Sequence, residues 1–219
     1  MLPHRKSHLL TDQSYSIQSV SPSSRENGIK RRIVNVVSTA ELDQTVDLKV
    51  LNQYSWGLYD QAIYPAGYIR DGDIQGMVEI FNTGKLVSVG AQNLRASFLN
   101  LSHAKDLLVR AGMIFDVKLR PQVQNLVASA SLGHPVDLRT AKTSIPGATY
   151  DSKRFSGIII RKTVHSPGFF IFANGKIVVV GARQLSEITR VISMVDRMTT
   201  KTRVSPVNGR RELWGQKRT

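Results

Sequence analysis

The chain has 219 residues, of which 41% are hydrophobic, enough for a substantial core in one or two domains. It contains no cysteine, which excludes disulfides and thiolate metal sites, and no apolar run nears the ~18 residues of a membrane-spanning helix. The net charge of +14 favours a polyanionic partner, most often a nucleic acid, although solvated Lys and Arg of a soluble protein give the same charge.

The positive charge is unevenly distributed. Residues 1–32 carry 6 basic and 2 acidic residues, and residues 199–219 carry 6 basic and 1 acidic. We interpret these ends as a disordered basic N-terminal arm and a basic C-terminal tail. Lys30-Arg31-Arg32 in the arm either binds phosphate, acts as an import signal or forms a solvated boundary of the fold. Between the ends, residues 33–113 have a net charge of −2 and residues 114–198 a net charge of +7.

The first unit, residues 33–113, shows strand and helix patterns in turn. We predict a strand at 33–39, in which alternation places Asn35, Val37 and Thr39 on one face. The further predicted elements are a helix from about 43 to 56, strands at 66–70, 77–82 and 85–89, and a helix at 94–111. That last helix carries apolar residues at three- and four-residue steps and stops at Gly112.

The second unit, residues 114–198, has the same plan. We predict a strand at 123–129, a short helix after Asp137, strands at 156–162, 168–173 and 176–180, and a helix at 185–198. Arg183, Arg190 and Arg197 recur every seven residues and therefore line one face of the last helix. This face is either solvated or contacts a protein or nucleic acid.

One eleven-residue stretch occurs twice. Phe81–Ala91 returns as Phe172–Ala182, 91 residues later, and each copy reads as strand, Gly-containing turn, strand. Flanking landmarks keep nearly the same offset, since Tyr64 matches Phe155 and Asn35 matches Asn125. This register indicates that a whole unit was duplicated, and we expect the two copies to be related by a pseudo-two-fold axis.

We expect the two units to share one antiparallel sheet with helices on one face and the other face open. The open face would carry mainly aliphatic residues and two Asn amides, and it would be nearly free of charge. An exposed apolar sheet surface of that size needs a partner, and this one suits a widened DNA minor groove.

These motifs resemble the TATA-box-binding protein family over about residues 33–198. The resemblance is carried by Asn35–Thr39, Asn125–Ser129, the duplicated Phe81–Ala91 and Phe172–Ala182, and Arg154–Gly157. Kinking of DNA through the minor groove by a sheet is already established for this family. The resemblance implies an α+β saddle of two pseudo-symmetric repeats, with a curved ten-stranded antiparallel sheet and four helices on the convex face.

The resemblance also implies roles for particular residues. The aromatic wedges that enter DNA would be Tyr64, Phe81, Phe155 and Phe172. The minor-groove surface would comprise Asn35, Val37, Thr39, Val87, Val89, Asn125, Val127, Ser129, Phe170, Val178 and Val180. Phosphates would be contacted by Arg70, Lys85, Arg161, Lys176 and Arg183. A loop with Asp151, Lys153 and Arg154 would meet the B-type initiation factor.

The chain departs from the family pattern at several of these places. Val89 and Val180 replace threonines, and Glu79 stands where a groove-contacting leucine is usual. A carboxylate buried against DNA without a partner costs several kcal/mol. Only Asp151 keeps the acidic character of the partner loop. These differences put a strict TATA preference and the usual partner contacts in doubt.

The resemblance implies a general transcription initiation factor that binds and bends A·T-rich promoter DNA as a monomer and nucleates preinitiation-complex assembly with other basal factors. The alternative is a protein-interaction platform of the same fold with weakened DNA binding. We do not expect an enzyme, a cofactor or a metal site, because the five histidines have no ligand spacing and no phosphate loop is present. The arms favour a nuclear protein; an archaeal source would place it in the cytoplasm or nucleoid.

Overall fold

A computed structural model describes residues 23–26, 29–161, 163–164 and 166–199. In this part of the chain ten strands form one antiparallel sheet in the order β3-β4-β5-β6-β2-β7-β10-β9-β8, with β1 beside β2. The strands are β1 (Ser23–Glu26), β2 (Ile29–Glu41), β3 (Gly57–Leu58), β4 (Ala66–Ile69), β5 (Met77–Phe81), β6 (Lys85–Ala91), β7 (Gln122–Ser131), β8 (Gly157–Ile160), β9 (Gly168–Phe172) and β10 (Lys176–Ala182).

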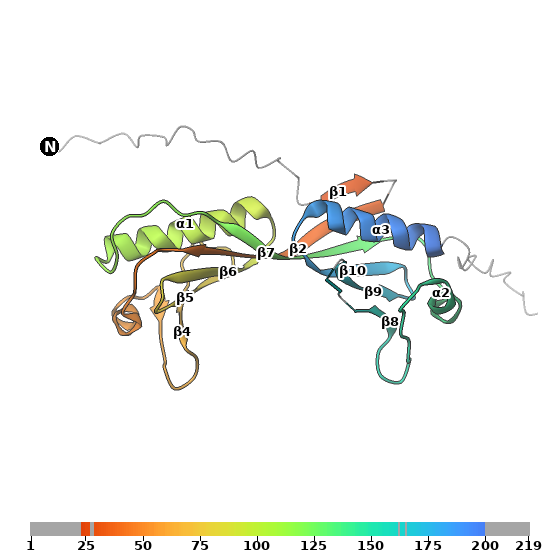
Figure 1. Cartoon of the computed structure of the whole chain (residues 1–219), viewed down its shortest axis with the longest axis horizontal. Helices are drawn as coiled ribbons and strands as arrows, with labels where there is room; N and C mark the ends of the chain where they lie inside the picture. The colour runs from red at the N-terminus through yellow and green to blue at the C-terminus, as the bar shows by residue number, and fades with distance from the viewer. Residues whose placement is uncertain (1–22, 27–28, 162, 165, 200–219) are drawn as a thin grey trace, which may run out of the picture.

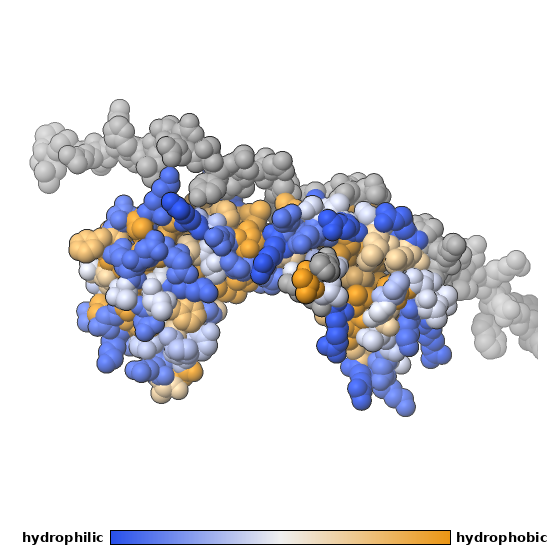
Figure 2. Space-filling view, in the orientation of Figure 1, coloured by the Kyte–Doolittle hydropathy of each residue, from blue (hydrophilic) through white to orange (hydrophobic). Residues whose placement is uncertain are grey.

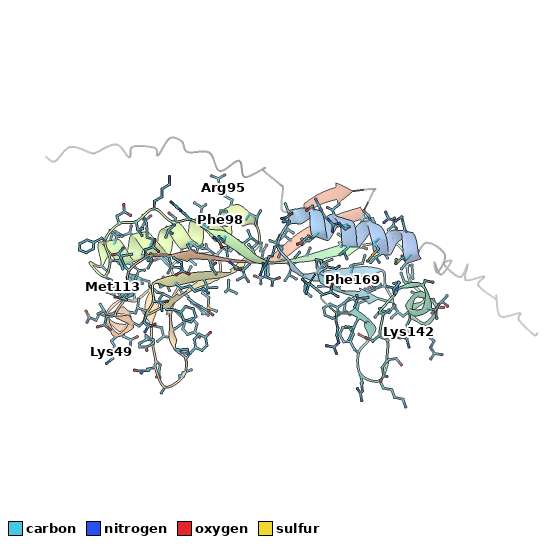
Figure 3. All side chains as sticks on the ribbon, viewed as in Figure 1. Lys49, Arg95, Phe98, Met113, Lys142 and Phe169 are labelled. Atoms are coloured by element: carbon cyan, nitrogen blue, oxygen red, sulfur yellow. The ribbon has the colours of Figure 1, made fainter. Side chains whose placement is uncertain are left out.

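The sheet is bent into an arch, and the two long helices cover its convex side (Figure 1). These helices are α1 (Leu94–Arg110) and α3 (Leu185–Thr199). The short helices η1 (Leu48–Gln53) and α2 (Leu138–Ser144) lie at the outer flanks, which Lys49 and Lys142 mark (Figure 3). The predicted saddle of two repeats is therefore confirmed, with two of its four helical segments at the flanks instead of over the convex face.

The centre of the arch is the antiparallel pair β2–β7. Asn35 pairs with Val127, Val36 with Leu126, and Val37 with Asn125. Each asparagine thus lies opposite a valine of the other unit, and the pair Val36–Leu126 lies on the pseudo-two-fold axis. The two units therefore share one continuous sheet and cannot separate without breaking these backbone hydrogen bonds.

Burial alternates along the strands because successive side chains point to opposite faces. The convex-facing residues of β2, β6, β7 and β10 are buried, among them Val36, Leu86, Leu126 and Val179. They pack in two clusters, one under each long helix. The intervening residues of the same strands are only half-buried, so the concave face is open.

The Gly-containing turns of the duplicated motif are confirmed as hairpins. Gly84 and Gly175 have φ of +89° and +80°, in the left-handed region that favours glycine. A Cβ at either position would lie 2.1 Å from a carbonyl oxygen, of Gln44 and His134 respectively. Both the backbone conformation and the close approach therefore require glycine, which accounts for its return in each repeat.

Two expectations about the first unit are wrong. Strand β2 begins at Ile29, so residues 29–32 belong to the sheet and not to the arm, and β1 pairs with them. Ile29 and Ile33 are buried in the core of the second unit, and the intervening basic run obscured that alternation. The predicted helix at 43–56 is only the 3₁₀ turn η1, because β2 extends to Glu41.

The other boundaries agree with the predicted ones to within a few residues. Residues 1–22 and 200–219, most of the predicted arm and tail, lie outside the described residues, as do Lys162 and His165. No helix in the described residues combines the length and apolar character that a membrane span requires.

Candidate nucleic-acid interface

All the predicted groove residues lie on the concave face. They come from the four central strands β6, β2, β7 and β10, and from β9 in the case of Phe170. Cross-strand pairing brings them side by side, since Thr39 faces Val87, and Val178 lies between Ser129 and Phe170. Each of them is half-exposed, and most of their strand neighbours, such as Val36, Leu126 and Val179, are buried. The result is a continuous surface of aliphatic and hydroxyl groups beneath the arch, and the hollow between the two lobes is visible in Figure 2.

The two asparagines are held by backbone hydrogen bonds. Asn35 Oδ1 accepts from the N–H of Gly90 at 3.0 Å, and Asn125 Oδ1 accepts from the N–H of Gly181 at 2.9 Å. Because a backbone N–H only donates, the amide oxygen must face it, and the Nδ2 group is turned away with its two donors. Both glycines have positive φ and lie where β6 and β10 shift register. The repeat therefore presents a matched pair of donors near the centre of the face.

The predicted wedge residues meet in pairs at the two ends of the face. The ring centroids of Tyr64 and Phe81 are 6.5 Å apart, and those of Phe155 and Phe172 are 5.6 Å apart. In each pair one ring comes from the loop that hangs below the arch and the other from the end of β5 or β9 (Figure 1). Tyr64 is 37% exposed to solvent, so the first pair is accessible to a ligand on the concave side.

The predicted phosphate-contacting side chains are all exposed; they are Arg70, Lys85, Arg161, Lys176 and Arg183. Arg70 Nη2 lies 3.6 Å from the sulfur of Met77, which faces the concave side. Lys85 lies opposite Glu41, whereas Lys176 lies opposite Ser131, which also pairs with Lys30. The rim of the second unit is therefore more cationic than that of the first.

Lys30 and Arg32 join this rim, although the sequence assigned them to the arm. They line a hollow with Asn174 and Lys176 at the edge of the second unit. The guanidinium of Arg31 instead donates to Thr189 Oγ1 on α3, and Arg32 Nη2 donates to Gln92 Oε1 at 2.7 Å. Ile29, Arg31 and Ile33 share one face of β2, and the two isoleucines are the only apolar signal for this part of the strand.

The predicted partner loop is shaped by Asp151. Its Oδ1 accepts from the N–H of Lys153 at 3.0 Å, and its Oδ2 lies 3.6 Å from Nε of Arg154. Both basic side chains are exposed, and the tip of the second unit is hydrophilic (Figure 2). Asp151 is therefore engaged within its own loop, and the surface it leaves for a partner is basic.

The equivalent rows of the two units differ in chemistry. Tyr68, Glu79 and Val87 lie side by side in the first unit, where the second has Ile159, Phe170 and Val178. Burial raises the pKa of the Tyr68 hydroxyl, and the nearby Glu79 and Tyr64 raise it further. Tyr68 was missed as a member of this row because only strand pairing brings it beside Glu79.

One acidic cluster lies outside the concave face. Ligand atoms of Asp71, Asp73 and His103 are within 4.8 Å of one another, between the β4–β5 turn and α1. His103 Nε2 lies 3.0 Å from Asp71 Oδ1, so the imidazole already serves as the partner of that carboxylate. Asp71 Oδ1 also accepts from the N–H of Asp73 at 3.2 Å. The sequence did not indicate the cluster, because His103 is 32 residues from Asp71.

Comparisons with known proteins agree with this geometry. Residues 30–108 and 120–201 match the family model described as transcription factor TFIID (or TATA-binding protein, TBP). The TATA-box-binding protein of Cenarchaeum symbiosum is 42% identical over 161 residues, covering 73% of this chain and 88% of that protein. That of Pyrobaculum islandicum is 33% identical over 165 residues, covering 74% and 81%. The solved structure of Methanococcus jannaschii TBP superposes with a TM-score of 0.71 at 23% identity, covering 78% of this chain and 99% of that one.

Proposed function

The chain belongs to the TATA-binding protein family, and on that premise we propose that it is a transcription initiation factor that binds and bends promoter DNA through the minor groove. The observation that carries the proposal is the open apolar concave face, which ends at both sides in a pair of aromatic rings. A monomeric protein rarely exposes such a surface without a partner. The proposed action is binding and deformation, without catalysis.

The chemistry of the face matches the floor of an A·T-rich minor groove. There the bases present only acceptors, adenine N3 and thymine O2, and no amino group. The free Nδ2 groups of Asn35 and Asn125 are donors of the required kind. Valines on either side of them contact the groove without competing for hydrogen bonds. Insertion of an apolar wedge costs a few kcal/mol per unstacked base step. The additional contacts between the bent DNA and the protein surface offset this cost.

The charge of the molecule supports the same proposal. We propose that the exposed cations on the two rims contact the two phosphate backbones of a bound duplex. Such contacts make affinity strongly dependent on salt. We propose binding as a monomer, because the two pseudo-symmetric units already supply both halves of the site.

Partner contacts are proposed at the second hanging loop, residues 150–156. We propose that a B-type initiation factor docks there, and that acidic groups of that factor face Lys153 and Arg154. The relatives reported above come from archaea, so the nuclear location expected from the arms is not supported. We propose the nucleoid of an archaeal cytoplasm as its place of action.

A fluorescence-resonance bend assay tests the proposal on end-labelled A·T-rich and G·C-rich duplexes. The expected result is a sharp increase in transfer on the A·T-rich duplex, which Phe81→Ala and Phe172→Ala each reduce. Phe115→Ala is the matched control, because Phe115 is 86% exposed and lies beyond α1, outside the concave face. Equal affinity for both duplexes without bending contradicts the proposal. Negligible binding to any duplex at low salt would instead support the protein-interaction platform.

A further inference from the structure

The two ends of the concave face are not equivalent. Glu79 on β5 and Phe170 on β9 occupy matching positions in the repeat, and both are half-exposed on the concave side. Glu79 lies between Tyr68 and Val87, whereas Phe170 lies between Ile159 and Val178. One carboxylate therefore stands on a face whose other groups are aliphatic, aromatic, hydroxyl or amide, and it stands in one half only.

Within the described residues the Glu79 carboxylate has no hydrogen bond or ion pair to another side chain. The guanidinium of Arg70, which follows the neighbouring strand β4, contacts Met77 instead. Lys85, which begins the adjacent strand β6, lies opposite Glu41. The carboxylate is thus left to interact with whatever covers the face, and when ionised it is a pure acceptor.

Against A·T pairs this acceptor would meet only other acceptors in the minor groove. The single donor that the groove offers is the 2-amino group of guanine. An ionised carboxylate that loses water and gains no donor is costly, whereas a charge-assisted hydrogen bond offsets that cost. We propose that Glu79 accepts a hydrogen bond from a guanine 2-amino group and so selects a G·C pair at one end of the site. This inference rests on the minor-groove binding proposed above.

The position of the selected pair follows from the strand order. The pseudo-two-fold axis lies between β2 and β7, and β5 is the second strand beyond β2. At about 4.8 Å per strand, Glu79 lies roughly 12 Å from the axis along the sheet. This corresponds to about three to four base pairs from the centre at ~3.4 Å per base pair. The matching pair on the other side meets Phe170, which offers no acceptor, so the preferred element is asymmetric and the protein binds it in one direction.

The test isolates the 2-amino group by base substitution. Duplexes differ at one position only, scanned across both halves of an A·T-rich site, and carry A·T, G·C, inosine·C or 2,6-diaminopurine·T there. Inosine lacks the 2-amino group of guanine, and diaminopurine adds it to an A·T pair. Affinity is measured by fluorescence anisotropy, and bending by energy transfer. We expect the two pairs with the amino group to bind about 10-fold more tightly than their counterparts, on one side of the centre only.

Variants assign the effect to Glu79. Glu79→Leu should abolish the preference and tighten binding to the all-A·T duplex, because the repulsion from base acceptors is removed. Phe170→Glu should create the same preference on the other side. Glu41→Gln is the matched control, since it removes a carboxylate of the same unit at the rim and should leave the preference unchanged.

The outcomes separate this inference from the function on which it rests. Equal affinity for guanine and inosine at every position, by a protein that still bends A·T-rich DNA, overturns the inference and leaves the proposed function standing. A preference that survives Glu79→Leu overturns the inference as well. Absence of binding and bending on every duplex overturns both.

Discussion

Asp60 and Asp151 close the same turn in the two halves of the molecule. The Oδ1 atom of Asp60 accepts from the N–H of Ala62 at 2.9 Å, and its carbonyl oxygen accepts from the N–H of Tyr64 at 3.1 Å. Asp151 makes the equivalent bonds, at 3.0 Å to the N–H of Lys153 and at 2.9 Å to that of Phe155. Each aspartate therefore positions the ring four residues later, which is one member of a wedge pair.

Replacement of either aspartate should loosen the adjacent wedge. We expect Asp60→Ala and Asp151→Ala to reduce the bend of an A·T-rich duplex while thermal unfolding changes little, because the loops are exposed. Asn can accept the same N–H, so Asp60→Asn and Asp151→Asn are the matched controls and should bend DNA normally. Energy transfer across end-labelled DNA measures the bend. Equal bending by the alanine and asparagine variants would show that the turn does not position the ring.

The amide donors of Asn35 and Asn125 should be essential for affinity. The change Asn125→Asp keeps the oxygen that accepts from Gly181 but replaces the NH₂ group by a second acceptor. We expect a loss of at least about 10-fold in affinity for an A·T-rich duplex, since a lost hydrogen bond is joined by repulsion from base acceptors. Asn35→Asp should behave alike. Fluorescence anisotropy measures the affinity, and an unchanged value would exclude these amides from the contact.

The two rims should differ in salt dependence. Each phosphate contact contributes about 0.9 to the slope of log K against log salt concentration. We expect Lys176→Ala to reduce the slope by about that amount. Lys85→Ala should reduce it less, because Lys85 lies opposite Glu41 and part of its charge is offset. A titration of affinity from low to high salt gives both slopes. If neither variant changes the slope, neither lysine contacts a phosphate.

A buried polar network supports the first unit. Asn100 on α1 donates through Nδ2 to the Gln75 carbonyl oxygen at 2.8 Å and to Ser88 Oγ at 3.1 Å. The matching position in the second unit is the buried Val191. We expect Asn100→Ala to lower the free energy of unfolding by about 2–3 kcal/mol, because polar groups remain buried without partners. Urea unfolding measures it, with the exposed Ser102→Ala as the control. A change below about 0.5 kcal/mol would show that the network contributes little.

Acid should remove one local contribution to stability. The N–H of Asp73 holds the pKa of the Asp71 carboxyl below its ordinary value, burial opposes this, and the His103 contact lowers the pKa further. Because the folded pKa is the lower one, the contribution is present above the unfolded pKa and is lost as pH falls through the folded value. Asp71→Asn should therefore melt earlier than the wild type near about pH 6, and this difference should disappear as the pH falls below the ordinary titration range of an aspartate carboxyl. Melting curves across this range measure it, and a constant difference would contradict the assignment.

Local patterns were sufficient to predict most of the sheet. The period of two along 35–39 and 125–129 agrees with the side chains that share the concave face, because successive strand residues point to opposite faces. A register shift between Ile33 and Asn35 breaks that period and places Ile33 in the core. The Gly-containing turns were equally clear, since their backbone conformation admits few other residues. Charge patterns misled at residues 29–32, where the basic run concealed the buried Ile29 and Ile33.

Other features depended on which strands became neighbours. Nothing near Glu79 in the sequence indicates Tyr68 beside it, and nothing near Asn100 indicates Ser88 beneath it. Residues far apart along the chain meet only through strand pairing and helix packing. The sequence by itself therefore determined the repeat, the turns and the face on which most residues of the central strands lie, since these depend on backbone geometry over a few residues. Only the tertiary structure decided that Tyr68 stands beside Glu79 in one half and Ile159 beside Phe170 in the other, because these contacts exist only when separate strands are paired side by side.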